Sequence, residues 1–513
     1  MKTITNIIYP TLAAFAFACF AVLPEAQAVT PVPDGGYAGG NTAEGTSALL
    51  SLTTGTYNTA VGFSSLLSNA DTSFNTGVGA GTLLLNTAAE NTATGAGALL
   101  TNTTGAGNTA DGAFALFNNT EGPFNTAAGW SALFSNTTGD RNTAFGSRAL
   151  PSNTTGFENT AVGRSALLFN TTGGDNVAIG VDALQDNTAG INNVAVGNFA
   201  LLTAIGHSNT GTGFSALGGS AQVDGTGDNN TANGANALGS NTTGSENTAV
   251  GASALFSNTE ATFNTAVGFE TLLNNTVGQG NAALGWHALY TNIAGFNNTA
   301  VGADALALNT GDGNTALGIN AGFNLTDGSS NIDIGDDVVG VAGESGTIRI
   351  GNQGTQTATY IAGISGTPVV GDPVVVDANG QLGTATSSAR FKKEIKPMDE
   401  ASEAILALKP VTFEYKQDSK GTPQFGLIAE EVAKVNPDLV VRNRKGEIYS
   451  VRYEAVNAML LNEFLKAHGQ LQDLKAIVAE QQMQIKALTS GLQKISAQLE
   501  LNRPAPQTVL SNQ

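Results

Sequence analysis

The sequence predicts a mostly β fold: a parallel β-solenoid (β-roll) with rungs of about 17 residues, then a small α+β domain and a C-terminal trimeric coiled coil. Three observations favour this order. One short motif recurs along most of the chain, the charge balance changes abruptly near Ser387, and apolar residues follow a 4-3 spacing near the end. The repeat is considered first, because a fixed internal period decides the architecture.

The repeated unit reads roughly N-T-A-V-G-x-x-A-L-x-x-N-T-T-G-x-x, and its leading asparagines run from Asn41 to Asn331. The step between them keeps the length of this unit almost throughout, and it is one residue shorter at three places. The step is longer between Asn209 and Asn230, where the insertion GGSAQVDG predicts a surface loop. A unit this short has no helical period and cannot form a pair of helices.

Each unit is therefore interpreted as one rung of a parallel β-solenoid. The Asn-Thr-Thr-Gly segment predicts a turn, because Asn and Gly accept positive φ. Stacking would place each asparagine over the next, so that their amides form a ladder of hydrogen bonds. Ala, Val and Leu from each rung are expected to fill a thin core. Eighteen rungs at ~4.8 Å each would give a rod of roughly 85 Å.

The repeats resemble the left-handed β-roll of trimeric adhesin heads (YadA-like), and the closest matches are NVAIG at 176–180 and NVAVG at 193–197. The resemblance covers residues 41–351 and implies packing as a trimer.

From Ile332 the period fails. β-branched residues then alternate with turn residues, which predicts a β-rich connector over 352–386 with a hairpin at 377–380.

The segment 1–28 predicts a signal peptide. Lys2 precedes an apolar run, and AQA at 26–28 is a small-x-small cleavage signal, so the mature chain is expected to begin after Ala28 with a linker over 29–40. The protein is therefore predicted to be secreted or held at the cell surface. The single cysteine, Cys19, lies in this segment, so no disulfide is expected. No transmembrane helix is expected in the mature chain.

Charge divides the chain at the same place as composition does. Residues 29–386 contain 25 acidic and 4 basic residues and no lysine, whereas residues 387–513 contain 15 acidic and 17 basic residues. Such asymmetry marks a domain boundary. The acidic excess disfavours binding to nucleic acid or to anionic lipid. His207 and His287 have no neighbouring ligands in the sequence, so neither a metal nor a cofactor is predicted.

Two further interpretations of the repeats are weighed. Regular threonines could form a flat ice-binding face, although a β-forming residue on each rung explains them more simply. The Asn-Thr-Thr triplets match the pattern for N-glycosylation, although repeated turn chemistry explains them better.

After Ser387 the pattern is α+β. A helix capped by Asp399 is predicted over 400–408, strands are predicted in VTFEYK and EIYSVRY, and QFGLIAEEVAKVNPDLV predicts a strand followed by a helix. A long helix is expected to begin near Glu454 and to form a coiled coil over 460–502, before a tail at 503–513.

The predicted coiled coil has a seam in which apolar residues recur every four and three residues. The seam consists of Leu460, Phe464, Ala467, Leu471, Leu474, Val478, Gln481, Ile485, Leu488, Leu492, Ile495 and Leu499. Gln481 is its one polar layer and is expected to set register or oligomeric state. Ile, Val and Leu mix at both seam positions, which does not select a dimer and is compatible with a trimer.

A Ser-Lys pair is the candidate for chemistry in this part. Serine is a poor nucleophile until a base takes its proton. His468 is the only histidine after Ser387 and lies on the predicted coiled coil, so a Ser-Lys pair is the remaining arrangement. SSARFKKEI offers Ser387 and Lys392, five residues apart, although a surface charge run also explains that spacing.

The same segment resembles the C-terminal intramolecular chaperone domain of endosialidases and phage tailspikes, a self-cleaving peptidase family. The resemblance extends from Ser387 to about Leu501, with the chaperone domain proper over 387–459. The motifs that carry it are SSARFKKEI at 387–395, LKPVTFEYK at 408–416 and FGLIAEEV at 425–432.

The resemblance implies that Ser387 attacks the bond between Thr386 and Ser387, with Lys392 as the base. Ser388 stands where the family has aspartate, so Ser388 and Lys393 remain second candidates for nucleophile and base.

The sequence therefore predicts an exported homotrimeric fibrous protein, adhesin- or spike-like, with a host or surface glycan or protein as the receptor of its roll. Near-identical rungs can pair out of register, and a C-terminal domain that aligns three chains would prevent this. That domain would then cut itself off, acting once as a serine autopeptidase without an external substrate. The alternative is an ice- or glycan-binding solenoid with a permanent, non-cleaving trimerisation domain.

Overall fold

The structure is a computed structural model, and the residues that it describes are 37–218, 226–352, 355–356, 358–361, 374–377, 380–384, 386–443 and 445–503. They fall into two compact units, residues 1–359 and residues 360–513, and each unit is described by itself. The predicted signal peptide with Cys19, most of the linker, most of the insertion loop, the tip of the predicted hairpin and most of the tail lie outside the described residues.

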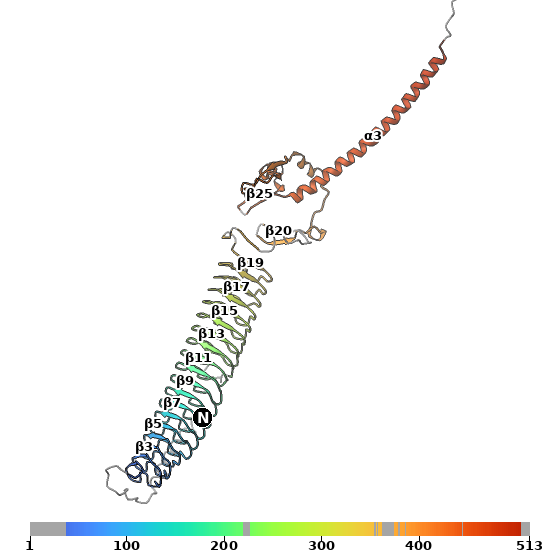
Figure 1. Cartoon of the computed structure of the whole chain (residues 1–513). Helices are drawn as coiled ribbons and strands as arrows, with labels where there is room; N and C mark the ends of the chain where they lie inside the picture. The colour runs from blue at the N-terminus through green and yellow to red at the C-terminus, as the bar shows by residue number, and fades with distance from the viewer. Residues whose placement is uncertain are drawn as a thin grey trace, which may run out of the picture. The chain divides into compact units, whose positions relative to one another are not determined.

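The first unit is the predicted parallel β-solenoid (Figure 1). Its short strands form one 19-stranded sheet, and each strand pairs in parallel with the strand one repeat later. Ala161 lies beside Ala178, for example, so equivalent residues stack in columns. The strands are β1 (Thr42–Glu44), β2 (Thr59–Val61), β3 (Thr76–Val78), β4 (Thr92–Thr94), β5 (Thr109–Asp111), β6 (Thr126–Ala128), β7 (Thr143–Phe145), β8 (Thr160–Val162), β9 (Val177–Ile179), β10 (Val194–Val196), β11 (Thr210–Thr212), β12 (Thr231–Asn233), β13 (Thr248–Val250), β14 (Thr265–Val267), β15 (Ala282–Leu284), β16 (Thr299–Val301), β17 (Thr315–Leu317), β18 (Ile332–Ile334) and β19 (Ile348–Ile350).

The solenoid continues beyond the last asparagine repeat. β18 pairs with β17, and β19 pairs with β18, both in parallel register. The expectation that the period fails from Ile332 is therefore wrong as far as Ile350. The strand pattern persists there, while the inward residue changes from alanine to Asp333 and Arg349.

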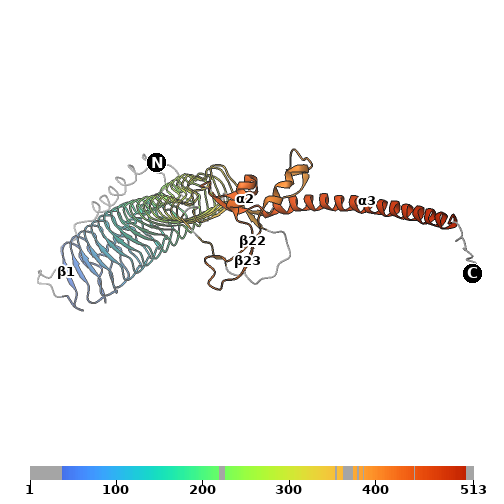
Figure 2. The same ribbon diagram turned by 90° about the horizontal axis from the view of Figure 1, so that it is seen from above.

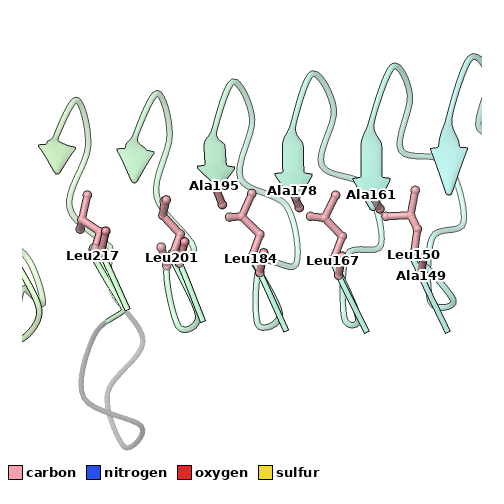
Figure 3. Packing of buried hydrophobic residues seen from close by; sticks show 14 of the residues in the cluster. Ala149, Leu150, Ala161, Leu167, Ala178, Leu184, Ala195, Leu201 and Leu217 are labelled. Carbon is pink, nitrogen blue, oxygen red and sulfur yellow. The ribbon is translucent and has the colours of Figure 1, made fainter. Parts of the chain in front are cut away.

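Alanine and leucine form the core. The middle residue of the strands and the Ala-Leu pair that follows are buried along the rod, and Figure 3 shows Leu150, Leu167 and Leu184 in one row against the strand alanines. The predicted place of valine in the core is wrong: Val61 and Val162 are both 37% exposed. Side chains alternate between the two faces of a strand, so an inward alanine turns the residue after it outward.

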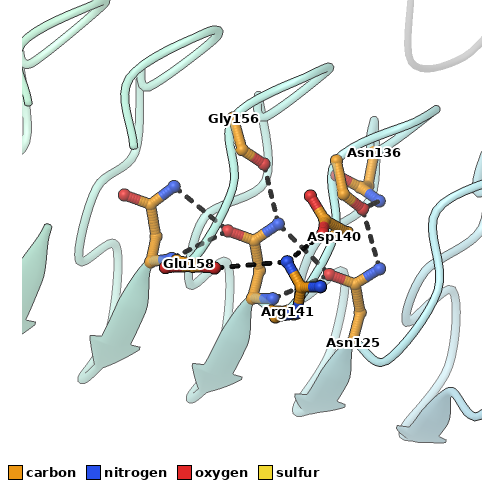
Figure 4. A network of polar contacts seen from close by, with 9 residues as sticks. Asn125, Asn136, Asp140, Arg141, Gly156 and Glu158 are labelled. Atoms are coloured by element: carbon orange, nitrogen blue, oxygen red, sulfur yellow. Dashed lines mark hydrogen bonds and ion pairs between the residues drawn. The ribbon is translucent and has the colours of Figure 1, made fainter. Parts of the chain in front are cut away.

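The predicted asparagine ladder is present. The backbone N–H of Asn142 donates to Asn125 Oδ1 at 2.9 Å, and Asn142 Nδ2 donates to Asn125 Oδ1 at 3.1 Å and to the Gly156 carbonyl at 2.8 Å (Figure 4). A second ladder follows the turns, where Asn136 Nδ2 donates to Asn119 Oδ1 at 2.7 Å. These asparagines are buried, so in the folded rod the Asn-Thr-Thr triplets serve hydrogen bonding rather than glycan attachment.

Left-handed backbone occurs at other positions than the turn chemistry predicts. Within one rung, Gly163 has φ +133°, while Ser165 and the core residue Leu167 have φ of 57° and 52°. The turn residues Asn170 and Gly173 are not left-handed. A left-handed non-glycine residue costs roughly 1–2 kcal/mol, so the contacts between stacked rungs must hold these corners in place.

The second asparagine ladder has a gap. Asn187 Nδ2 donates to Asn170 Oδ1 at 3.0 Å, but Asn187 Oδ1 is buried and has no hydrogen-bond partner among the described residues. The next rung has the buried Ala204 in the ladder position. A shortened turn can hold a ladder bond, because Asn86 in another shortened rung donates to Asn69 Oδ1 at 3.2 Å. In the third shortened rung Asn309 donates to the Gly311 carbonyl instead, and Asn292 Oδ1 stays without a partner among the described residues.

Replacing Ala204 by asparagine is therefore expected to stabilise the rod. The new amide would donate to Asn187 Oδ1 and satisfy a buried acceptor, which contributes about 1 kcal/mol. Hydrogen exchange at the amides of residues 187–209 would measure the effect, with slower exchange expected. Ala189→Asn, on the exposed part of the neighbouring turn, is the matched control and is expected to change little. Equal exchange in both variants would contradict the prediction.

The second unit consists of small two-stranded sheets, short helices and one long helix (Figure 2). Its elements are β20 (Val374–Val376), β21 (Leu382–Thr384), η1 (Ala389–Phe391), η2 (Asp399–Ala407), β22 (Val411–Phe413), β23 (Gln424–Gly426), α2 (Ala429–Val435), η3 (Pro437–Leu439), β24 (Val440–Arg442), β25 (Ile448–Val451) and α3 (Tyr453–Leu501). The antiparallel pairs are β20 with β21, β22 with β23, and β24 with β25.

Most predicted elements of this unit lie where the sequence placed them, with one difference. The segment 400–408 is a 3-10 helix, η2, which includes Asp399 instead of being capped by it. Buried Val432, Leu439, Val451 and Met459 form a small core that joins α2, β25 and the start of α3.

α3 begins within one residue of the predicted start near Glu454 and runs on as a single helix. Its seam side chains are exposed in the single chain, from 42% at Val478 to 67% at Leu488. In the part of the chain that the structure describes, no helix combines the length and apolar character needed to cross a membrane.

Candidate functional site

The candidate site lies at the start of the C-terminal part and is formed by one short turn. In η1 the Phe391 N–H donates to the Ser388 carbonyl at 3.0 Å, and the Lys392 N–H donates to the Ala389 carbonyl at 3.1 Å. This turn places Lys392 Nζ 3.3 Å from Ser387 Oγ. The five-residue spacing of the predicted pair therefore corresponds to direct contact between its two functional atoms.

The second candidates are placed differently. The Ser388 side chain makes no capping hydrogen bond to η1 and is exposed. Among the described residues, no hydrogen bond joins Lys393 to either serine. The geometry therefore favours Ser387 and Lys392 over Ser388 and Lys393.

Both members of the pair are open to solvent in the single chain, as is Thr386 before them. The nearby guanidinium of Arg390 lies 4.6 Å from the centre of the Phe391 ring. Lysine can accept a proton only in its neutral form, which a desolvated setting favours. The single chain brings the Ser387 and Lys392 side chains into contact but does not bury them.

A polar cluster that the sequence did not reveal joins η2 to α3. Ser402 is fully buried, and its hydroxyl donates to Glu463 Oε1 at 2.5 Å and accepts from Asn462 Nδ2 at 2.7 Å. Lys466 Nζ donates to the same Glu463 oxygen at 2.7 Å. The Lys466 hydrogen bond lowers the pKa of Glu463, and the Glu463 hydrogen bond raises the pKa of Lys466. Lys466 and Glu463 therefore form an ion pair next to the buried Ser402, and this cluster joins η2 to α3.

A second contact fixes the start of α3 against the FGLIAEEV motif. The Leu427 N–H donates to the Tyr453 hydroxyl at 3.0 Å. Tyr453 is the first residue of α3, and Leu427 lies between β23 and α2. The motif therefore positions the long helix relative to the small sheet that precedes α2.

His287 has neighbours that its place in the sequence did not suggest. Its Nε2 lies 3.0 Å from Glu270 Oε2, its Nδ1 lies 3.6 Å from Asp304 Oδ1, and its ring stacks on Trp286 with centroids 3.7 Å apart. Glu270 lies one repeat before the histidine and Asp304 one repeat after it, so stacking of the rungs brings them together. Among the described residues, no group of three His, Cys, Asp or Glu side chains is arranged to hold a metal ion.

A charged cluster ends the solenoid core. Asp333 is fully buried, and burial raises its pKa to about 6 although Arg349 lies near it. Arg349 Nη1 is 3.7 Å from Asp333 Oδ1, and the same guanidinium is paired with Glu344, with Nη2 2.6 Å from Oε2. The cluster replaces the alanine column, so the apolar core ends at β18.

Comparison with known proteins identifies the C-terminal part. Residues 387–441 match the family model described as chaperone of endosialidase, Peptidase_S74. This confirms the resemblance inferred from SSARFKKEI and the two motifs after it, and the match begins at Ser387 itself. No curated protein and no solved structure matches the chain. The resemblance of the repeats to adhesin heads therefore stays a prediction.

Proposed function

We propose that the protein is an exported trimeric fibre whose C-terminal chaperone domain aligns three chains and then cuts itself off between Thr386 and Ser387. The 3.3 Å contact between Lys392 Nζ and Ser387 Oγ carries this proposal, because it lies in the segment that matches the endosialidase chaperones. The stacked solenoid would be the mature fibre.

The proposed trimer rests on α3. Its seam repeats over more than five heptads, and the seam side chains are exposed in the single chain, which is the pattern of a helix that buries one stripe against other copies. Gln481 would form one polar layer that fixes the register. η2 packs on α3 through Ser402, Asn462 and Glu463, none of which is a seam residue, so the seam stays open to other copies.

In the proposed reaction, Ser387 Oγ attacks the carbonyl carbon of Thr386, the peptide bond between the two residues breaks, and an ester forms. Lys392 takes the proton of the hydroxyl and gives it to the departing amine of Ser387. Water then hydrolyses the ester. This leaves a carboxylate on Thr386 and restores the Ser387 hydroxyl.

Assembly would supply the burial that the single chain lacks. A neutral lysine needs a desolvated site, and both Ser387 and Lys392 are exposed here. Covering by neighbouring copies would therefore make cleavage follow trimer formation. The product would be kinetically trapped, because the released fibre no longer contains the domain that aligned it.

Intact-mass analysis of the purified protein tests the cleavage. The wild type is expected to yield a fragment that begins at Ser387, and both Ser387→Ala and Lys392→Ala are expected to stay uncut. Ser388→Ala and Lys393→Ala are the matched controls and are expected to be cut. An uncut wild type that is still trimeric by native mass would refute self-cleavage and leave a permanent trimerisation domain.

The alternative of an ice-binding solenoid has one observation in its favour. The first residue of the strands points outward, and threonines there stack in register, as Thr59 does with Thr76. Thermal hysteresis of the rod together with an uncut chain would support that alternative.

The proposed receptor of the fibre is a surface glycan or protein. Binding of the cleaved rod to a glycan array would test whether the receptor is a glycan.

A further inference from the structure

The outward face of the solenoid strands carries a column of apolar side chains. The third residue of the strand is aliphatic along much of the rod and lies on the outer side of the sheet. Val61, Val78, Val162, Ile179, Val196 and Leu284 belong to it, and each is 37–48% exposed in the single chain. Polar third residues interrupt the column at Thr94, Asp111, Thr212 and Asn233, so it consists of apolar runs over neighbouring rungs.

A second column, which is apolar in some rungs only, follows the first in each unit, and it holds Ser147, Arg164, Asn198 and Asp336 in other rungs. The residue that follows the glycine of each rung is large and apolar at Trp130, Phe214, Phe269, Trp286 and Ile319, and these side chains are 48–54% exposed. The Trp286 ring stacks on the ring of His287, and His287 in turn lies between Glu270 and Asp304. The two columns together are called the outer stripe.

The outer stripe is poor in charge on a rod that is strongly acidic. Its polar gaps are local, and at one of them the Thr94 hydroxyl donates to the Asp111 carboxylate. Monomeric proteins seldom expose an apolar patch larger than a few hundred Å², so a stripe along many rungs indicates a partner. The partner must present an apolar surface with the same length and period.

We propose that the outer stripe is the surface by which the solenoids of the assembled copies pack against one another. The inference rests on the proposed trimer, because parallel copies joined at α3 would bring identical stripes to the same height. A second copy of this chain is the occupant that matches the rung period along the whole rod. Like-charged acidic sides would repel, which leaves the outer stripe, where charges are few, as the face that can approach.

The large aromatic residues of the second column are the expected anchors of this interface. Tryptophan dominates binding energy where it is buried in an interface, and the stacking on His287 fixes the Trp286 ring before contact.

Labelling of single cysteines with a maleimide tests the proposal in the full-length chain. Val162→Cys and Val196→Cys place a thiol on the stripe, at positions that are 37% and 38% exposed in the single chain. Val277→Cys is the matched control, on an Asn-Thr-Val-Gly turn outside the stripe and 46% exposed. Each variant also carries Cys19→Ser, and native mass of each sample reports whether it is trimeric.

In trimeric samples, both stripe cysteines are expected to react at least about tenfold more slowly than the control cysteine, because burial in an interface blocks access to the thiol. Trimers whose stripe cysteines react as fast as the control would overturn the stripe as the interface while leaving the proposed function intact. Monomers by native mass would overturn the proposed trimer and the inference together. Unfolding at high denaturant should equalise the rates, which confirms that the difference comes from structure.

Discussion

Gly146→Ala is expected to separate the rungs that carry β7 and β8 and to destabilise the rod by at least about 3 kcal/mol. Gly146 has φ +131°, a conformation that residues with a side chain rarely adopt. A Cβ atom there would lie 2.7 Å from the carbonyl oxygen and 2.8 Å from the carbonyl carbon of Gly163 in the next rung. Both neighbours are backbone atoms of a paired strand corner, so neither can move without breaking the stack.

Limited proteolysis and thermal unfolding measure this effect. A new cleavage site close to Gly146 and a lower unfolding temperature are expected. Gly469→Ala in α3 is the matched control, since a Cβ there meets nothing within 4 Å and alanine stabilises a helix by roughly 0.5–1 kcal/mol. Protease resistance equal to that of the wild type in the Gly146 variant would show that the rungs do not depend on this close approach.

Asp333 is expected to make the end of the rod more stable as the pH falls from 7 to 4. Burial raises the pKa of Asp333 to about 6, so the folded state binds its proton more tightly than the unfolded state does. The folded state therefore loses stability as the pH rises from the pKa of Asp333 in the unfolded chain to its pKa in the folded rod. Above that range the buried carboxylate is ionised, and the loss of stability stays constant. This loss in the free energy of unfolding amounts to up to about 3 kcal/mol.

The difference in free energy of unfolding between wild type and Asp333→Ala isolates this contribution from the many other carboxylates. The difference should shift in favour of the wild type as the pH falls through 6, and the variant should lack that part of the pH dependence. Asp336→Ala removes an exposed carboxylate in the same rung and is the matched control. An identical pH profile in wild type and Asp333→Ala would mean that the carboxylate is not desolvated.

The features that the sequence predicted well are those that every rung repeats. The Asn-Thr-Ala-Val-Gly period sets the strands, and a buried asparagine at the same place in each unit has its own copies in the neighbouring rungs as hydrogen-bond partners. The pair Ser387 and Lys392 was found through a family motif, and the structure then placed the two side chains in contact. The long helix α3 begins within one residue of the start expected near Glu454.

The features that the sequence did not reveal depend on which face a residue occupies or on distant contacts. Valine after an inward alanine must point outward, so residues such as Val162 mark a surface and not the core. Ser402 and Glu463 are 61 residues apart, and no local sequence pattern predicts the hydrogen bond between them. His287 meets its acids only through stacking of the rungs, although the spacing of Glu270, His287 and Asp304 by one repeat each was a usable signal.

Strand pairing in the solenoid connects each rung only with the rung before it and the rung after it, as Ala161 with Ala144 and Ala178 shows. Stability then accumulates as a sum over neighbouring units. Recombination between near-identical stretches of the gene could add or remove a whole unit without disturbing the C-terminal domain. The length of the solenoid can therefore change by about 4.8 Å per unit, while the contacts between neighbouring units stay the same.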